Sequence, residues 1–194
     1  GIFVNSDATF FCIRATIANN VINNPGDEGI DVENGSFSEH IKITGNIINN
    51  PTNRGIEYRG GPYFKISDNT VTDASDYGIL VSAASLQAGK GQVCGNTVEG
   101  GCTAEGIRVN NYNLVTVRDN VVYDITSSTG INIPAGSVIV GGNIVEDTVS
   151  SSSSGILTSS SAAGTTLGSV TNKVEIFDKT GVSVGFAPVY DSIT

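Results

Sequence analysis

The chain has 194 residues, of which 24 are glycine, and it contains neither methionine nor tryptophan. Its formal net charge of −9 argues against a nucleic-acid-binding surface and against attraction to anionic membranes. No unbroken apolar stretch is long enough to span a bilayer, and no signal peptide is visible, so membrane insertion is not expected.

A Gly-Ile-X motif, usually followed by Val, Ile or Tyr, recurs roughly every 25 residues along the chain. Its glycines are Gly1, Gly29, Gly55, Gly78, Gly106, Gly130 and Gly155. A second ladder with the same period consists of Asn20, Asn46, Asn69, Asn96, Asn120 and Asn143. Two interleaved ladders of one period indicate a single structural unit stacked about seven times.

Each repeat is predicted to hold about three short strands and no helix. Within Gly-Ile-X-Val the apolar residues lie two apart, so they point to one side of a strand and X points to the other. The segments around each Asn alternate in the same way, as in residues 41–43 and 115–117. The economical arrangement is an all-β solenoid, a parallel β-helix with one coil per repeat and neighbouring coils about 4.8 Å apart.

The two ladders have expected structural roles. Asn tolerates left-handed backbone at a corner, and stacked Asn amides can hydrogen-bond from coil to coil. Glycine before each Ile is expected to let the chain turn sharply without a clash at Cβ.

The β-helix is predicted over residues 1–168, and a C-terminal hairpin or tail over residues 169–194. The chain starts inside a coil without Met, so we expect a fragment or processed piece that lacks N-terminal coils or a cap. Alternating segments at 173–177 and 182–186 flank a turn signal at 178–181. This hairpin is expected to cap the last coil or to pack against other chains.

The three cysteines give no sign of a zinc site, because they lack a CxxC or His-rich companion. Cys94 occupies the position that other coils fill with Thr44, Ser67 and Arg118. A free thiol is favoured, and a bridge between Cys94 and Cys102 is the alternative. The absence of a disulfide framework implies assembly in a reducing cytoplasm, even if the finished protein works outside.

The ladders of residues 1 to about 168 resemble the pectin-lyase-like right-handed β-helix superfamily, which includes pectate lyases, polygalacturonases, alginate epimerases and bacteriophage tailspikes. The resemblance implies a right-handed helix that binds or cuts polysaccharides along its outer face. The tail, residues 173–190, is similar to strand endings of phage tailspike and tail-fibre proteins. This likeness implies a homotrimer in a virion tail or outside the cell, assembled in the bacterial cytoplasm.

The outward position X carries Phe3, Asp31, Glu57, Leu80, Arg108, Asn132 and Leu157. Two residues further on lie Glu33 and Arg59, so that Asp31, Glu33, Glu57 and Arg59 form a charged square on adjacent coils. Carboxylates about 5 Å apart would be near the separation typical of retaining glycosidases. Neighbouring like charges should raise one pKa. We predict Asp31 and Glu57 as acid and base or nucleophile, with Glu33 as the alternate.

Further residues are predicted to bind the substrate, because aromatic rings stack on sugar faces and polar tips bond hydroxyls. They are Arg59, Tyr63, Asp76, Tyr77 and Arg108, and Asp27, Glu28 and Tyr58 could also line the groove. The competing interpretation is a solvated charge ladder that contributes little to stability. Tyr58 is favoured as a core residue because it replaces an inward aliphatic one, and His40 as a surface residue.

Three functional classes are compatible with this pattern, and neither a metal nor another cofactor is predicted. The first is a tailspike-like glycanase that hydrolyses a bacterial surface polysaccharide. The second is a polyuronate lyase or epimerase, for which Arg59, Arg108 and Tyr63 are the supporting residues. The third is a non-catalytic trimeric adhesin or shaft, in which the carboxylates are surface groups only.

Overall fold

The computed structural model describes residues 1–4, 12–33, 38–87, 90–126, 129–134, 138–146, 156–158, 170–177 and 183–190. Every regular element in these ranges is a β-strand. The described part of the chain has no helix with the length and apolar character needed to cross a membrane.

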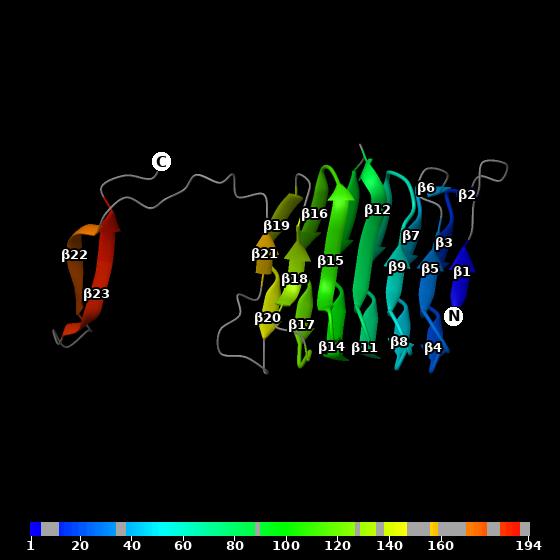
Figure 1. Ribbon diagram of the computed structural model, residues 1–194, viewed down its shortest axis with the longest axis horizontal. Coiled ribbons are helices and arrows are strands. Elements are labelled where there is room, and N and C mark those ends of the chain that lie inside the picture. Colours follow the sequence, from blue (N-terminus) through cyan, green and yellow to red (C-terminus); the bar gives the residue numbers. More distant parts are fainter. Residues whose placement is uncertain are drawn as a thin grey trace. The chain divides into compact units, whose positions relative to one another are not determined.

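Most strands belong to three parallel sheets (Figure 1). Sheet I comprises β1 (Ile2–Val4), β5 (Ile30–Val32), β9 (Ile56–Tyr58), β12 (Ile79–Gln87), β15 (Glu105–Tyr112), β18 (Thr129–Ile133) and β21 (Ile156–Thr158). Sheet II comprises β3 (Thr16–Ala18), β7 (Lys42–Thr44), β10 (Phe64–Ser67), β13 (Gly91–Cys94), β16 (Val115–Arg118) and β19 (Val138–Gly141). Sheet III comprises β4 (Val21–Asn23), β8 (Ile47–Asn49), β11 (Thr70–Ala74), β14 (Thr97–Gly101), β17 (Val121–Tyr123) and β20 (Ile144–Glu146).

The chain visits the three sheets in turn, so that each coil contributes one strand to each sheet and β21 begins a further coil. Each strand pairs in parallel with the corresponding strand of the coils before and after it. In sheet I the register aligns the motif isoleucines in one column, which consists of Ile2, Ile30, Ile56, Ile79, Ile107, Ile131 and Ile156. The predicted parallel β-helix with three strands per coil is confirmed.

The core is the inside of the coil, where columns of Ile and Val are fully buried. Three aromatic residues interrupt these columns. Tyr58 packs against Phe64 with ring centroids 4.6 Å apart, and Phe64 meets the edge of Tyr112 at 5.2 Å. The Tyr58 hydroxyl donates to the Gly61 carbonyl at 2.8 Å, and the Tyr112 hydroxyl donates to the Gly60 carbonyl. Tyr58 is therefore a core residue, as its inward position predicted, and does not line a sugar groove.

The Asn ladder runs between sheets II and III and is hydrogen-bonded from coil to coil. Asn46 Nδ2 donates to Asn69 Oδ1 at 2.9 Å, Asn69 Nδ2 donates to Asn96 Oδ1 at 2.9 Å, and Asn96 Nδ2 donates to Asn120 Oδ1 at 2.9 Å. These four residues are at most 1% exposed. The predicted stacking of amides is confirmed.

The left-handed corner, however, lies one residue earlier than predicted. At this corner the residue with positive φ is the one that precedes each ladder Asn, namely Asn19, Gly45, Asp68, Gly95, Asp119 and Gly142. The ladder Asn itself is free to point its amide inward because the preceding residue absorbs the turn. Gly, Asn and Asp are the residue types that adopt this conformation most easily.

The motif glycines are needed because a Cβ atom would clash with neighbouring atoms, and not because their backbone has positive φ. A Cβ on Gly55 would stand 2.3 Å from Val71 Cγ1 and 2.5 Å from the carbonyl oxygen of Gly78 on the next coil. Gly29, Gly78 and Gly106 show the same pair of contacts with their own neighbours. Glycine is required because the backbone of sheet I approaches both sheet III and the following coil closely, so the expected Cβ clash is confirmed.

Two smaller sheets complete the described chain. The strands β2 (Cys12–Ile13) and β6 (Ser38–Glu39) pair in parallel, and β22 (Val170–Phe177) and β23 (Ser183–Tyr190) form the predicted antiparallel hairpin. Its predicted turn at 178–181 lies outside the described residues. Internal contacts divide the chain into Gly1–Ser160 and Ser161–Thr194.

The cysteines that the structure describes are free thiols. Cys94 stands in register with Ser67 and Arg118, as its place in the repeat predicted. Cys102 is buried in the core, and burial raises the pKa of its thiol to about 12. The alternative of a bridge between Cys94 and Cys102 is therefore wrong. The side chain of Cys12 lies outside the description.

Candidate functional site

A cavity of about 450 Å³ opens on the outer face of sheet I. Its lining comes from β1, β5 and β9 and from the residues that flank these strands, namely Gly1, Ile2, Phe3, Asp27, Glu28, Asp31, Glu33, Arg54, Glu57 and Arg59. Five of these ten residues are acidic and two are arginines. We call this cavity the acidic cavity.

The repeat places the predicted catalytic residues side by side. Asp31 on β5 is the register partner of Glu57 on β9, and Phe3 precedes Asp31 in the same column. Glu33 and Arg59 follow β5 and β9, and the backbone N–H of Arg59 donates to the Val32 carbonyl at 2.8 Å. The predicted charged square is therefore present, with all four members on the cavity.

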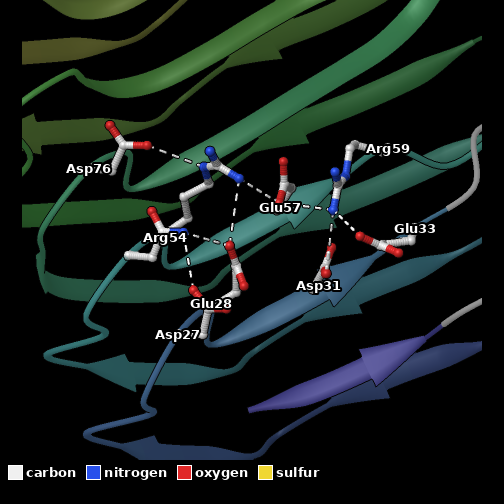
Figure 2. A network of polar contacts seen from close by, with 9 residues as sticks. Asp27, Glu28, Asp31, Glu33, Arg54, Glu57, Arg59 and Asp76 are labelled. Atoms are coloured by element: carbon white, nitrogen blue, oxygen red, sulfur yellow. Dashed lines mark hydrogen bonds and ion pairs between the residues drawn. The ribbon is translucent and has the colours of Figure 1, made fainter.

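Arg59 holds three carboxylates through a single nitrogen. Its Nη2 lies 3.5 Å from Asp31 Oδ2 and 3.3 Å from Glu57 Oε2, and it also donates to Glu33 Oε1. Figure 2 shows this guanidinium group between Glu57 and Glu33, with Asp31 below it. Arg59 is thus the common counter-charge of the candidate acid, base and alternate.

Arg54 is a second organising cation, which the sequence analysis missed. Its Nη1 donates to Glu57 Oε2 at 2.7 Å and lies 3.5 Å from Glu28 Oε1, while Nε donates to Asp76 Oδ2 at 3.2 Å. Glu57 therefore lies between two guanidinium groups, as Figure 2 shows. The repeat could have indicated this role of Arg54. Arg54 directly precedes a motif glycine, at the position that Glu28 and Tyr77 occupy in the neighbouring coils, so the three side chains form a column.

The two central carboxyl groups are buried, although they lie outside the coil. Asp31 is 8% exposed and Glu57 is 3% exposed. Asp31 Oδ1 is buried without a hydrogen-bond partner. Asp31 and Glu57 are therefore not solvated, although the ion pairs with Arg59 that the competing interpretation also implies are present.

Burial raises the pKa of Asp31 to about 6, against the lowering effect of Arg59 and with smaller raising effects from Glu57 and Glu33. Burial likewise raises the pKa of Glu28 above its ordinary value. The sequence predicted a raised pKa from like charges alone. Desolvation is the larger cause, because the carboxyl group loses water that the protein does not fully replace.

Polar side chains continue along sheet I beyond the acidic cavity. The Tyr77 ring has Arg54 Cζ 5.9 Å from its centroid and Arg108 Cζ 6.0 Å from it. Arg108 Nη1 lies 3.5 Å from the Tyr77 hydroxyl and 3.4 Å from Glu105 Oε1. Three predicted binding residues, Asp76, Tyr77 and Arg108, thus continue the charged face from the cavity toward the later coils.

Tyr63, by contrast, is not brought to this site. It stacks on the ring of His40, with centroids 4.9 Å apart and planes 8° apart, in a different cavity on sheet II. His40 is exposed, as predicted. Asp27 does line the acidic cavity, where its carboxylate accepts from Asn53 Nδ2 at 3.1 Å.

The arrangement provides a buried carboxyl group with a pKa of about 6 beside a carboxylate that is held by two arginines. Such a pair can transfer a proton and stabilise developing positive charge. Within the described ranges, no set of three or more His, Cys, Asp or Glu residues is arranged to hold a metal ion.

Comparison with known proteins identifies the family to which the chain belongs. The family described as a right handed beta helix region matches residues 1–101, slightly more than half of the chain. No curated protein and no solved structure matches the chain. The matched region contains the acidic cavity and the first four coils of the solenoid described above. The chain therefore belongs to the right-handed β-helix family.

Proposed function

We propose that the protein binds a bacterial surface polysaccharide on sheet I and hydrolyses it in the acidic cavity, as the depolymerase of a phage tailspike does. The parallel β-helix fold is common to polysaccharide-acting enzymes and adhesins, so the fold supports the substrate class but not the reaction. The observation that carries the reaction is the buried Asp31 carboxyl group, with a pKa of about 6, next to the arginine-held Glu57.

Asp31 is the proton donor in this proposal. A carboxyl group with a pKa of about 6 keeps its proton in mildly acidic solution, where an ordinary aspartate has lost it. It donates that proton to the glycosidic oxygen as the bond to the anomeric carbon breaks. The leaving sugar departs as a neutral alcohol, and Asp31 becomes a carboxylate.

Glu57 is the partner carboxylate, with Glu33 as its alternate. As nucleophile, Glu57 attacks the anomeric carbon, and water then releases the glycosyl group with Asp31 acting as base. As base, it takes the proton of a water molecule that attacks the same carbon directly. Glu57 is the register neighbour of Asp31, while Glu33 is the more exposed residue, with 34% of its side chain accessible.

The arginines position these groups rather than react. Arg59 contacts all three carboxylates, and Arg54 fixes Glu57 from the other side. Asp76, Tyr77 and Arg108 extend the polar face for sugar units on one side of the cleaved bond. Tyr77 offers a ring face for a pyranose and a hydroxyl group for hydrogen bonding.

A second candidate reaction, β-elimination on a uronate polymer, is supported by one contact. The guanidinium group of Arg108 lies 3.5 Å from the Tyr77 hydroxyl. In such a lyase an arginine would neutralise the uronate carboxylate, and a nearby tyrosine would remove the proton at C5. Tyr77 takes the role for which Tyr63 was considered, because Tyr63 lies on another sheet.

The test is product analysis on a panel of purified bacterial capsular polysaccharides and lipopolysaccharide O-chains. The proposal predicts new reducing ends without ultraviolet absorption from unsaturated sugars. Products that absorb in the ultraviolet would show that the polysaccharide is cleaved by elimination and not by hydrolysis. Binding of a polysaccharide without any product would overturn the catalytic proposal and favour a non-catalytic adhesin or shaft.

A further inference from the structure

A second cavity, of about 460 Å³, lies on the outer face of sheet II and has a composition opposite to that of the acidic cavity. Its lining includes Lys42, Lys65 and Lys90, which are all the lysines of the first 168 residues. No aspartate or glutamate is found among the described residues that line it. We call it the basic groove.

The repeat builds this groove as a row. Lys42 on β7 is the register partner of Lys65 on β10, and Lys65 is the register partner of Gln92 on β13. Thr116 on β16 continues the row. All four side chains alternate with buried residues and therefore point outward, with steps of about 4.8 Å between strands. Donor groups thus follow one another along the solenoid axis.

An exposed corner column runs beside this row. His40, Tyr63 and Leu114 each precede a sheet II strand by one or two residues, and all three have positive φ. Tyr63 is 47% exposed and Leu114 is 58% exposed, and the rings of His40 and Tyr63 lie parallel. Arg14 has positive φ at the equivalent place before β3, so this conformation belongs to the corner of the repeat, and it holds these exposed side chains beside the row of donor groups.

We infer that the basic groove is a second glycan-binding surface, for an acidic polysaccharide whose sugars carry carboxylate groups. The lysines, one strand apart, supply point charges for successive uronate units, and the stacked rings and Leu114 supply flat apolar surface for sugar faces. This surface lies on another sheet and does not depend on hydrolysis in the acidic cavity.

The experiment measures binding of oligogalacturonides of defined length by titration calorimetry at low and at physiological salt. Dextran oligosaccharides and single-stranded DNA of equal length are the comparison ligands. The variants are Lys42→Gln with Lys65→Gln, and Tyr63→Ala. The matched control is Arg118→Gln, which removes one positive charge from β16 of the same sheet at a residue that does not line the groove.

We expect the lysine variant to weaken oligogalacturonide binding at least about tenfold, and Tyr63→Ala to weaken it several-fold at either salt concentration. Arg118→Gln should bind like the unmodified chain. No binding of the oligogalacturonides, or equal loss in Arg118→Gln, would overturn the inference. Equal affinity for dextran or for single-stranded DNA would also overturn it, because the carboxylate-bearing sugar would then not be what is recognised. Lys90→Gln provides a second test if the double variant does not fold.

Discussion

Asp31 is a buried carboxyl group on the outer face of sheet I, where side chains of its type are ordinarily exposed. Its column and its neighbour Glu57 followed from strand alternation and from the repeat, so their adjacency was predictable from sequence. Its burial was not predictable. The outward face of a solenoid is normally solvated, and here Arg54 and Arg59 cover it from positions that the motif does not include.

Asp31 should make the stability of the fold depend on pH. Its pKa is about 6 when folded and 3.8 when unfolded, so its stabilising contribution is complete below about pH 3.8 and is lost as the pH rises through about 6. Asp31→Asn removes this titration. We expect its advantage in free energy of unfolding over the unmodified chain to grow by roughly 2–3 kcal/mol between pH 4 and 7.

Melting curves at successive pH values measure this difference. The control is Asp124→Asn, which replaces an exposed carboxylate that does not line the acidic cavity. Parallel profiles for Asp31→Asn and the unmodified chain would show that Asp31 titrates as an ordinary surface carboxylate. The same residue would then be a poor proton donor.

At the scale of the elements, most features of the Asn ladder could be predicted from the sequence. The ladder positions and the amide stacking were predicted, because buried amides must find partners and the neighbouring coil offers an identical one. The position of the left-handed corner was displaced by one residue. Asn can form either the left-handed corner or the stacked amide. Only the recurrence of Gly, Asn and Asp at the preceding residue shows that the corner lies there.

Asn96→Ala should destabilise the β-helix. Asn96 Nδ2 donates to Asn120 Oδ1 and to the Ile66 carbonyl, and Asn96 Oδ1 accepts from the backbone and side chain of Asn69. Alanine leaves buried groups on both sides unpaired, which costs on the order of 1–3 kcal/mol. Chemical denaturation measures the loss of free energy of unfolding.

The matched control is Asn49→Ala, which removes an exposed hydrogen bond between side-chain amides of neighbouring coils. Asn49 Nδ2 donates to Asn23 Oδ1 at 2.8 Å, but water can replace this bond. Its effect should stay within about 0.5 kcal/mol. Equal effects of the two substitutions would mean that the buried ladder contributes no more than a surface contact.

At the scale of the whole molecule, the sequence predicted the fold class, the three strands per coil and the C-terminal hairpin. The repeats that encode the fold class and the strands of each coil recur along the chain, so isolated exceptions do not obscure them. The hairpin was predicted from alternating segments on either side of a turn signal. Oligomeric state has no such periodic signal. The hairpin β22–β23 is a sheet of two strands, and the edges of such a sheet can pair with strands of other chains.

We therefore propose that copies of the chain associate through the hairpin into a homotrimer. Light scattering coupled to size-exclusion chromatography should give three times the mass of one chain. Removing residues 169–194 should abolish the trimer or cause aggregation, because unsatisfied strand edges associate unspecifically. A stable monomer of the whole chain would contradict the proposal, and an unchanged trimer after the deletion would place the contact elsewhere.

The central proposal is that a glycan is hydrolysed in the acidic cavity. The rate of glycan cleavage by Asp31→Asn and by Glu57→Gln tests this proposal most directly. The substrate is the polysaccharide that the product screen identifies, and Glu99→Gln, a carboxylate on sheet III, is the control. Each cavity variant should lose at least about a hundredfold in reducing-end release while still binding the polysaccharide. Rates equal to those of the unmodified chain in both cavity variants would contradict the account.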